Sequence, residues 1–137
     1  MGKSPREALA LLQAAAADGR LDALCAKHDV RVLTVFGSAV RPDAHPQDLD
    51  VAVGFEPGKR GDLLALLDDL SRLTGSDDVD LLVLDDAGPV ARERALVGCL
   101  ALYESEQSAY ALAQVAAMLD RMDTDWMRAL DLQTLRS

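Results

Sequence analysis

Basic residues are too few in this sequence to balance its acidic ones. The chain has 14 Lys and Arg against 23 Asp and Glu, which gives a formal net charge of −9 at pH 7. Broad binding to nucleic-acid backbones requires an excess of basic residues, so the composition argues against direct contact with nucleic acid. It is compatible with a small phosphate ligand held together with divalent cations, because an acidic site attracts such cations.

Cysteines are also scarce, and long apolar runs are missing. Cys25 and Cys99 are too few and too far apart for a disulfide framework or a zinc site, so we expect a reduced, cytoplasmic location. No stretch approaches the roughly 18 apolar residues of a membrane span, and we expect no membrane contact. Glu7 interrupts the N-terminal run of Ala and Leu, which therefore predicts a helix and not a signal peptide.

The residues that are present form an ordinary globular balance, with 50% hydrophobic and 27% charged residues in a chain of 137. A chain of this length can bury its own core, and it shows no internal repeat or linker. We therefore interpret residues 1–137 as one domain. Helices are predicted at 5–17, 21–29, 61–74, 89–96 and in the last third of the chain, and strands at 31–36, 48–55 and 79–84; the apolar stretch 99–103 is ambiguous.

The order of these elements predicts the fold class. A helix lies between the second and third strands, so these two strands are expected to be parallel through a crossover connection. The first two strands are joined by an irregular segment without a full helix, which allows a mixed sheet. The sequence thus predicts an α/β (α+β) domain with a small mixed β-sheet flanked by helices.

Acidic residues open two of the predicted strands. Asp48 and Asp50 are two residues apart and point to the same side of a strand, where two like charges repel unless a cation lies between them. Asp80 enters the third strand in the same way. Carboxylate oxygens suit Mg²⁺ or Mn²⁺, and three of them can hold two such ions for phosphoryl or nucleotidyl transfer. Asp80 is then also the candidate general base. The alternatives are solvated strand ends, with Asp78 on the same strand face as Asp80.

Gly37 and Ser38 directly follow the first predicted strand. A glycine at this position lets the backbone approach a phosphate closely, and N–H groups at the start of a helical turn attract anions. The Ser38 hydroxyl can add a donor. A Gly-Ser pair alone is a weak signal, but it gains specificity from the Asp-x-Asp strand and the later aspartate. Gly37 could alternatively serve only as a strand terminator.

The segment FGSAVRPDAHPQDLDVAV resembles the signature hG[GS]…D-h-D of the DNA polymerase β-like nucleotidyltransferase superfamily, in which h is apolar. It is most similar to the minimal nucleotidyltransferase (MNT) branch, with the pattern GSxARGxxxxxSDxDL, and ALVGCLALYE is similar to that branch's eGxxLYe segment. Val40, Pro42 and Gln47 depart from the pattern. None of these three departures removes a predicted metal ligand.

The resemblance implies a polymerase β-like fold, ATP as substrate, two Mg²⁺ ions (or Mn²⁺), and a nucleotide contact by Arg41. The alternative for Arg41 is a solvated side chain or an ion pair with an acid such as Asp43. The resemblance further implies an antitoxin that transfers AMP to a tyrosine of a cognate HEPN-type ribonuclease toxin, in a hetero-oligomer with that toxin. Two alternatives remain open. The chain could neutralise the toxin by binding alone, or it could modify a small molecule, as aminoglycoside nucleotidyltransferases do.

Three further features are interpreted from the residues. From about residue 106 the chain is predicted to be helical, with Leu119, Met122 and Trp126 near helical spacing, as part of the core or as a partner-binding surface. Arg92 and Arg94 are interpreted as an exposed helix face, with a nucleotide or partner contact as the alternative. His28 is expected at the surface.

Overall fold

A four-stranded mixed sheet forms the centre of the computed structural model, which describes the backbone of residues 3–136 and the side chains of residues 3–123, 126, 127 and 129. The predicted range of 1–137 therefore includes three terminal residues that lie outside the description. The strands are β1 (Val30–Phe36), β2 (Leu49–Phe55), β3 (Val79–Val83) and β4 (Leu100–Glu104), in the order β3-β2-β1-β4. The helices are α1 (Pro5–Asp18), α2 (Arg20–Lys27), α3 (Leu63–Thr74), α4 (Pro89–Leu96) and α5 (Ala109–Arg136), with single turns η1 (Gly37–Val40) and η2 (Leu84–Asp86).

The strand directions confirm the predicted mixed sheet. β2 and β3 are parallel and are joined through α3, as the helix between them predicted. β1 is antiparallel to β2 and also to β4. The ambiguous apolar stretch therefore becomes an edge strand, which local pattern alone could not distinguish from a helix.

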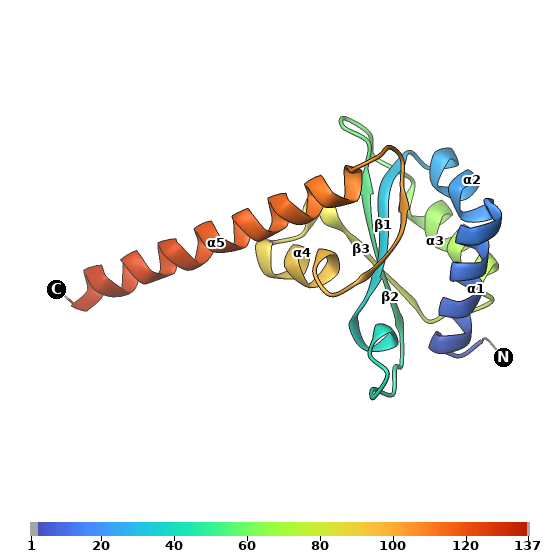
Figure 1. The fold of residues 1–137 in the computed structure, drawn as a ribbon, viewed down its shortest axis with the longest axis horizontal. Helices are drawn as coiled ribbons and strands as arrows, with labels where there is room; N and C mark the ends of the chain where they lie inside the picture. Colours follow the sequence, from blue (N-terminus) through green and yellow to red (C-terminus); the bar gives the residue numbers. More distant parts are fainter. Residues whose placement is uncertain (1–2, 137) are drawn as a thin grey trace.

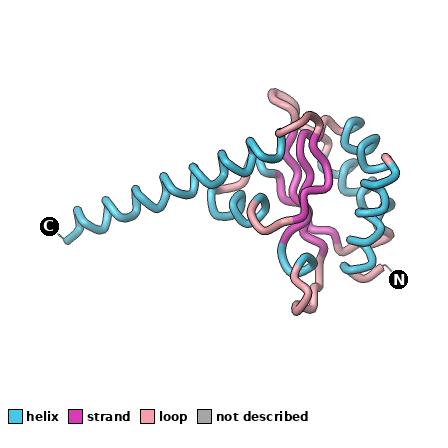
Figure 2. The backbone as a smooth tube through the Cα atoms, in the orientation of Figure 1, coloured by secondary structure: helices cyan, strands magenta, loops and turns pink. Residues whose placement is uncertain are grey.

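Helices cover both faces of the sheet, which explains why its central strands are almost continuously apolar (Figures 1 and 2). α1, α2 and α3 pack on one face, and α4 with the beginning of α5 packs on the other. Alternate residues of β1 join different clusters: Leu33 and Val35 lie in the core under α1–α3, and Val32 and Phe36 lie in the core under α4 and α5. The sheet thus separates two apolar cores.

The helix α5 begins against the body of the protein and then projects away from it (Figure 1). Its first turns are held by Tyr110, whose hydroxyl donates to the carbonyl of Leu96 at 2.8 Å, and by Ala117, which is buried. Burial raises the pKa of Tyr110 to about 12, so that this hydroxyl stays a donor. Within the described part of the chain, no helix has the length and apolar character needed to cross a membrane.

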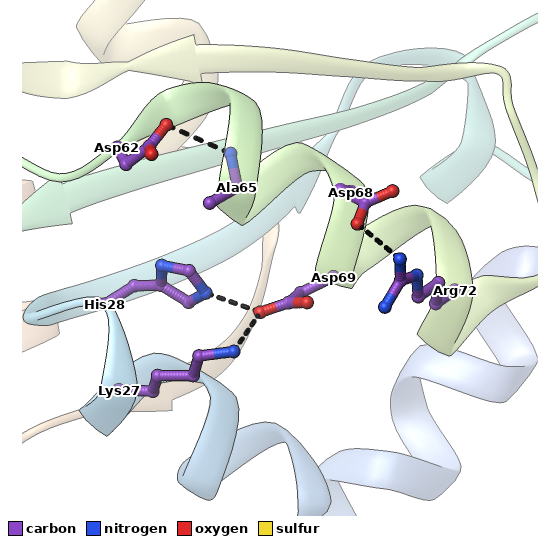
Figure 3. A network of polar contacts seen from close by, with 7 residues as sticks. All are labelled: Lys27, His28, Asp62, Ala65, Asp68, Asp69 and Arg72. Carbon is purple, nitrogen blue, oxygen red and sulfur yellow. Dashed lines mark hydrogen bonds and ion pairs between the residues drawn. The ribbon is translucent and has the colours of Figure 1, made fainter.

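A polar network joins α2 to α3 on the first face (Figure 3). His28 is buried, contrary to the expectation that it lies at the surface, and its Nε2 donates to Asp69 at 2.6 Å. Lys27 donates to the same carboxylate oxygen at 3.0 Å. These hydrogen bonds, that from His28 first, lower the pKa of Asp69 below its ordinary value of 3.8. Helical periodicity placed His28 at the end of a helix but could not reveal a partner 41 residues away.

We predict that Asp69→Asn lowers the free energy of unfolding and that its effect depends on pH. A carboxylate with a lowered folded pKa stabilises the protein above its unfolded pKa, and this contribution is lost as the pH falls through the folded value. Urea unfolding from about pH 6 down to about pH 2 should therefore show wild type and variant converging at the acidic end. Asp68→Asn is the control, because among the residues that the structure describes Asp68 forms only an exposed ion pair with Arg72. Equal effects of the two substitutions would contradict the prediction.

Candidate functional site

Strand pairing brings two of the three predicted carboxylates side by side. Asp50 is the register partner of Asp80 across the parallel pair β2–β3, and of Phe36 across the antiparallel pair β1–β2. Asp48 directly precedes β2 and is exposed, as is Asp80, whereas Asp50 is half-buried. The predicted acidic residues therefore gather at one end of the sheet, where β1 ends and β2 and β3 begin.

The electrostatic environment of Asp50 is unfavourable for its charge. Partial burial is the main cause that raises its pKa, followed by the charges of Asp80 and Asp48. The positive charge of Arg94 acts in the opposite direction, and a hydrogen bond with Asp80 adds to the rise. Such repulsion is typical of carboxylates that are placed together for a function and not for stability.

Gly37 fits tightly against this carboxylate. Its φ is +77°, a backbone conformation that favours glycine, and a Cβ built at this position would overlap the Oδ2 atom of Asp50. The turn η1 then carries Ser38, which is half-buried, and buries Ala39. Gly37 is therefore required by Asp50 as well as by the turn, a contact that sequence alone did not indicate.

Two neighbouring hollows open beside these residues. The first, of about 270 Å³, is lined by Phe36, Asp50, Asp80, Leu81, Leu82, Ala91 and Arg94. The second, of about 250 Å³, is lined by Phe36, Gly37, Val40, Arg41, Arg94, Val97 and Gly98. Gly37 and Arg41 thus line one hollow and the two paired carboxylates line the other, while Ser38 and Asp48 line neither. Phe36 and Arg94 border both.

A larger hollow, of about 610 Å³, lies elsewhere, around the loop between β2 and α3. Its lining includes Lys59, Arg60 and the aspartates of η2, but none of the residues predicted from sequence. Size alone would favour this hollow. The smaller pair combines repelling carboxylates, a glycine turn and arginines, and for this chemical reason we take it as the candidate site.

The loop that departs from the family pattern is held in place by α1. The guanidinium of Arg6 donates to the carbonyl oxygens of Arg41, Pro42 and Ala44, at 2.9, 3.5 and 2.5 Å. Val40 packs against the core under α1–α3. The loop backbone is thereby positioned from outside the site, and the side chain of Arg41 lines the second hollow.

The carboxylates fit Mg²⁺ in chemistry, because hard divalent cations prefer oxygen ligands. In the part of the chain that the structure describes, no group of three or more His, Cys, Asp or Glu side chains stands together as a ready metal site. The exposed Asp48 and Asp80 lie beside Asp50, close enough for their charges to raise its pKa. The three-residue ligand set therefore stays a prediction.

The two arginines of α4 differ from each other. Arg92 is half-buried and donates to the carbonyls of Leu84 and Asp85, so its interpretation as an exposed residue is wrong. Arg94 is exposed, but it borders both hollows beside Asp50. Sequence reasoning named Arg94 and preferred the solvent-facing interpretation. Only the packing of α4 against the sheet shows which of its side chains face the candidate site.

Comparison with known proteins identifies a family. A family model described as Polymerase beta, Nucleotidyltransferase, matches residues 20–108, which is more than half of the chain. No curated protein matches the sequence.

Several solved structures share the fold. A chain of a toxin–antitoxin complex with AMP-PNP matches with a TM-score of 0.66 and 19% identity, over 87% of this chain and 98% of that chain. A chain of the complex of tri-AMPylated Shewanella oneidensis HEPN toxin with MNT antitoxin matches with a TM-score of 0.64 and 19% identity. The match covers 91% of this chain and 99% of that chain. A chain of an MntA–HepT complex matches with a TM-score of 0.62 and 18% identity, over 87% of this chain and 96% of that chain. At these identities the likeness is one of fold.

We predict that Gly37→Ala is far more destabilising than Gly58→Ala. Both glycines have a φ near +75°, but a Cβ at Gly58 meets nothing within 4 Å, whereas one at Gly37 overlaps Asp50. Gly58→Ala should lower the free energy of unfolding by about 1 kcal/mol through backbone strain alone. Gly37→Ala should lose roughly 1–3 kcal/mol more, because Asp50 must shift. Urea denaturation of both variants measures the difference, and equal losses would show that Asp50 does not require the glycine.

Proposed function

The chain belongs to the polymerase beta nucleotidyltransferase family, and from this premise we propose that it transfers AMP from ATP to a HEPN-type toxin and thereby acts as its antitoxin. The observation that carries the proposal is the pairing of Asp50 with Asp80 beside the Gly37 turn. Two repelling carboxylates next to a tight glycine turn match the needs of nucleotidyl transfer, in which acidic groups and a phosphate chain must lie side by side.

The proposed roles follow from the positions of the residues. The backbone at Gly37 and Ser38 binds phosphate oxygens, with the Ser38 hydroxyl as a further donor, and Arg41 contacts the nucleotide across the second hollow. Asp48, Asp50 and Asp80 would hold Mg²⁺, which when bound neutralises charge on the phosphates and orients the reacting oxygens. Asp80 is exposed, so a tyrosine hydroxyl of the partner can reach it and give up its proton there.

The choice of partner is supported by proteins that share the fold. One of the solved complexes contains a tri-AMPylated HEPN toxin together with an MNT antitoxin, and another toxin–antitoxin complex contains AMP-PNP. The family match makes this chain a nucleotidyltransferase, which is the role we propose for it in such a pair. We therefore place the toxin, and not a small molecule, as the acceptor of AMP.

The toxin-binding surface is proposed to be an apolar stripe on α5, formed by Leu112, Val115, Leu119, Met122 and Trp126. All five are exposed, with exposed fractions of 63%, 52%, 56%, 65% and 66%. Their spacing of three and four residues places them along one side of the helix, as in a coiled-coil seam. The family match ends at residue 108, directly before α5 begins, so this helix is additional to the matched domain.

We predict that the double substitution Asp48→Asn with Asp50→Asn abolishes AMP transfer and leaves the fold intact. Transfer to the purified toxin should fall at least a hundredfold, on the order of the loss on removing one key electrostatic group from an active site. Stability should not decrease, because the change removes charge repulsion at Asp50. Mass spectrometry of the toxin after incubation with Mg²⁺ and ATP measures the transfer.

The matched control is Asp77→Asn with Asp78→Asn, which removes the same charge just before β3. This control should keep its activity, and loss of activity in it would favour Asp78 over Asp80 as the functional residue. If the Asp48/Asp50 variant still neutralises the toxin without adding AMP, the protein acts by binding alone. If it still adds AMP, the assigned carboxylates are wrong.

We predict that Leu119→Glu weakens toxin binding at least thirtyfold, since truncation or charging of a central contact residue commonly removes about 2 kcal/mol or more. Leu64→Glu is the control, because Leu64 is 81% exposed on α3 and lies outside the stripe. Calorimetric titration with the toxin measures both variants, and sedimentation of the protein alone tests whether the stripe instead pairs two copies. Unchanged binding by Leu119→Glu would place the interface elsewhere.

A further inference from the structure

Arg94 occupies a position between the two hollows of the candidate site. It lines the hollow of Asp50 and Asp80, and it also lines the hollow of Gly37 and Arg41. Among the residues that border both hollows, Phe36 is apolar, so Arg94 supplies the charge at the boundary. Ala91, one turn before it on α4, has a small side chain that also faces the first hollow.

The guanidinium of Arg94 is not used to hold the fold together. The neighbouring side chains on α4 do help to hold the fold. Arg92 donates to backbone carbonyls and approaches Asp120 at 3.6 Å, and Glu93 pairs with Arg121 at 3.3 Å. Within the described residues, the side chain of Arg94 makes no hydrogen bond or ion pair of its own, yet its charge acts on Asp50. Five N–H donors of fixed geometry are therefore available beside the site.

The second hollow is suited to an anion. In the described part of the chain, its charged lining consists of Arg41 and Arg94, with no acidic side chain, and it adjoins the turn that begins at Gly37. The first hollow contains the two carboxylates. A triphosphate laid across both would have the reacting phosphate at the carboxylates and the other two phosphates between the arginines.

We propose that Arg94 binds the β- and γ-phosphates of the nucleotide and holds the pyrophosphate group as it leaves. This inference rests on the proposed function. In the transfer step the acceptor oxygen forms a bond to the α-phosphorus, and the bond from that phosphorus to the oxygen of the β-phosphate breaks. The acceptor proton passes to Asp80, and the electron pair of the broken bond stays on pyrophosphate. Arg94 donates hydrogen bonds to the oxygens on which this charge accumulates.

The position predicts a discrimination between nucleotides. Arg94 contacts phosphates that ATP has and AMP lacks, so its removal should weaken ATP binding and leave AMP binding nearly unchanged. An arginine that served only to support α4 would affect both nucleotides alike, or neither. A lysine at the same position keeps the positive charge but not the planar guanidinium, so we expect it to retain part of the ATP affinity.

The test compares Arg94→Gln, Arg94→Lys and Arg60→Gln by calorimetric titration with ATP and with AMP, in the presence of Mg²⁺. Arg60 is an exposed arginine at the distant hollow, so Arg60→Gln matches the loss of one positive charge without touching the site. Arg94→Gln should weaken ATP binding roughly ten- to hundredfold, the range for a hydrogen bond to a charged group, and change AMP binding by less than about twofold. The ATP affinity of Arg94→Lys should lie between those of wild type and Arg94→Gln, and Arg60→Gln should bind ATP as tightly as wild type.

Each outcome bears on the inference. If Arg94→Gln binds ATP as tightly as Arg60→Gln, or loses ATP and AMP binding equally, the inference is wrong. If wild type binds no ATP, the inference about Arg94 and the proposed function are both wrong. If ATP binding depends on Arg94 but no AMP reaches the toxin, the inference stands and the choice of acceptor fails. Thermal unfolding of Arg94→Gln should differ only slightly from that of wild type, since within the described residues the side chain makes no hydrogen bond or ion pair and its charge only favours the ionised form of Asp50.

Discussion

The pairing of β2 on both of its edges is the constraint on which the rest of this structure depends. Hydrogen bonding to β1 on one side and β3 on the other fixes Asp50 next to Phe36 and Asp80. Because successive residues of a strand alternate between faces, Asp50 then points toward the side that α4 covers, and its neighbours Leu49 and Val51 enter the opposite core. A one-residue slip would bury the carboxylate under α1–α3 and turn the two apolar side chains toward the α4 side, where Asp50 now lies.

This placement opposes stability, and the surrounding residues limit its effect. Burial and two neighbouring carboxylates disfavour the charge of Asp50, while the nearby guanidinium of Arg94 favours it without closing into an ion pair. Gly37 leaves the space that the carboxylate occupies. Arg6 holds the loop around Pro42 from the outside through backbone carbonyl oxygens, so this contact does not depend on the side chains that depart from the family pattern. Functional sites commonly break local rules in this way and are supported from elsewhere.

Local pattern was sufficient for much of the fold and insufficient for contacts between distant segments. The β-branched run of β1 and the leucine spacing of α3 are signals within one element, and both predicted elements form. The strand 100–104 is short, and only its pairing with β1 distinguishes it from a helix. The Asp50–Asp80 neighbourhood was predictable because both residues open strands at the same end of the sheet. The positions of the Arg94 and His28 side chains depend on how the helices pack against the sheet and against each other. The spacing of residues along the chain does not predict this packing.

The helix α4 links the candidate site to the proposed partner-binding helix α5. On one side it presents Arg94 to the hollows beside Asp50, and on the other it holds α5 through the contacts of Arg92 and Glu93 with Asp120 and Arg121. A toxin bound along α5, as proposed, would therefore be positioned by the same eight-residue helix that borders the candidate site. Since transfer requires the acceptor oxygen within about 3–3.5 Å of the phosphorus, such a short rigid connection favours one orientation of the acceptor. The partner surface and the chemistry can then be aligned without any motion of the sheet that holds the carboxylates.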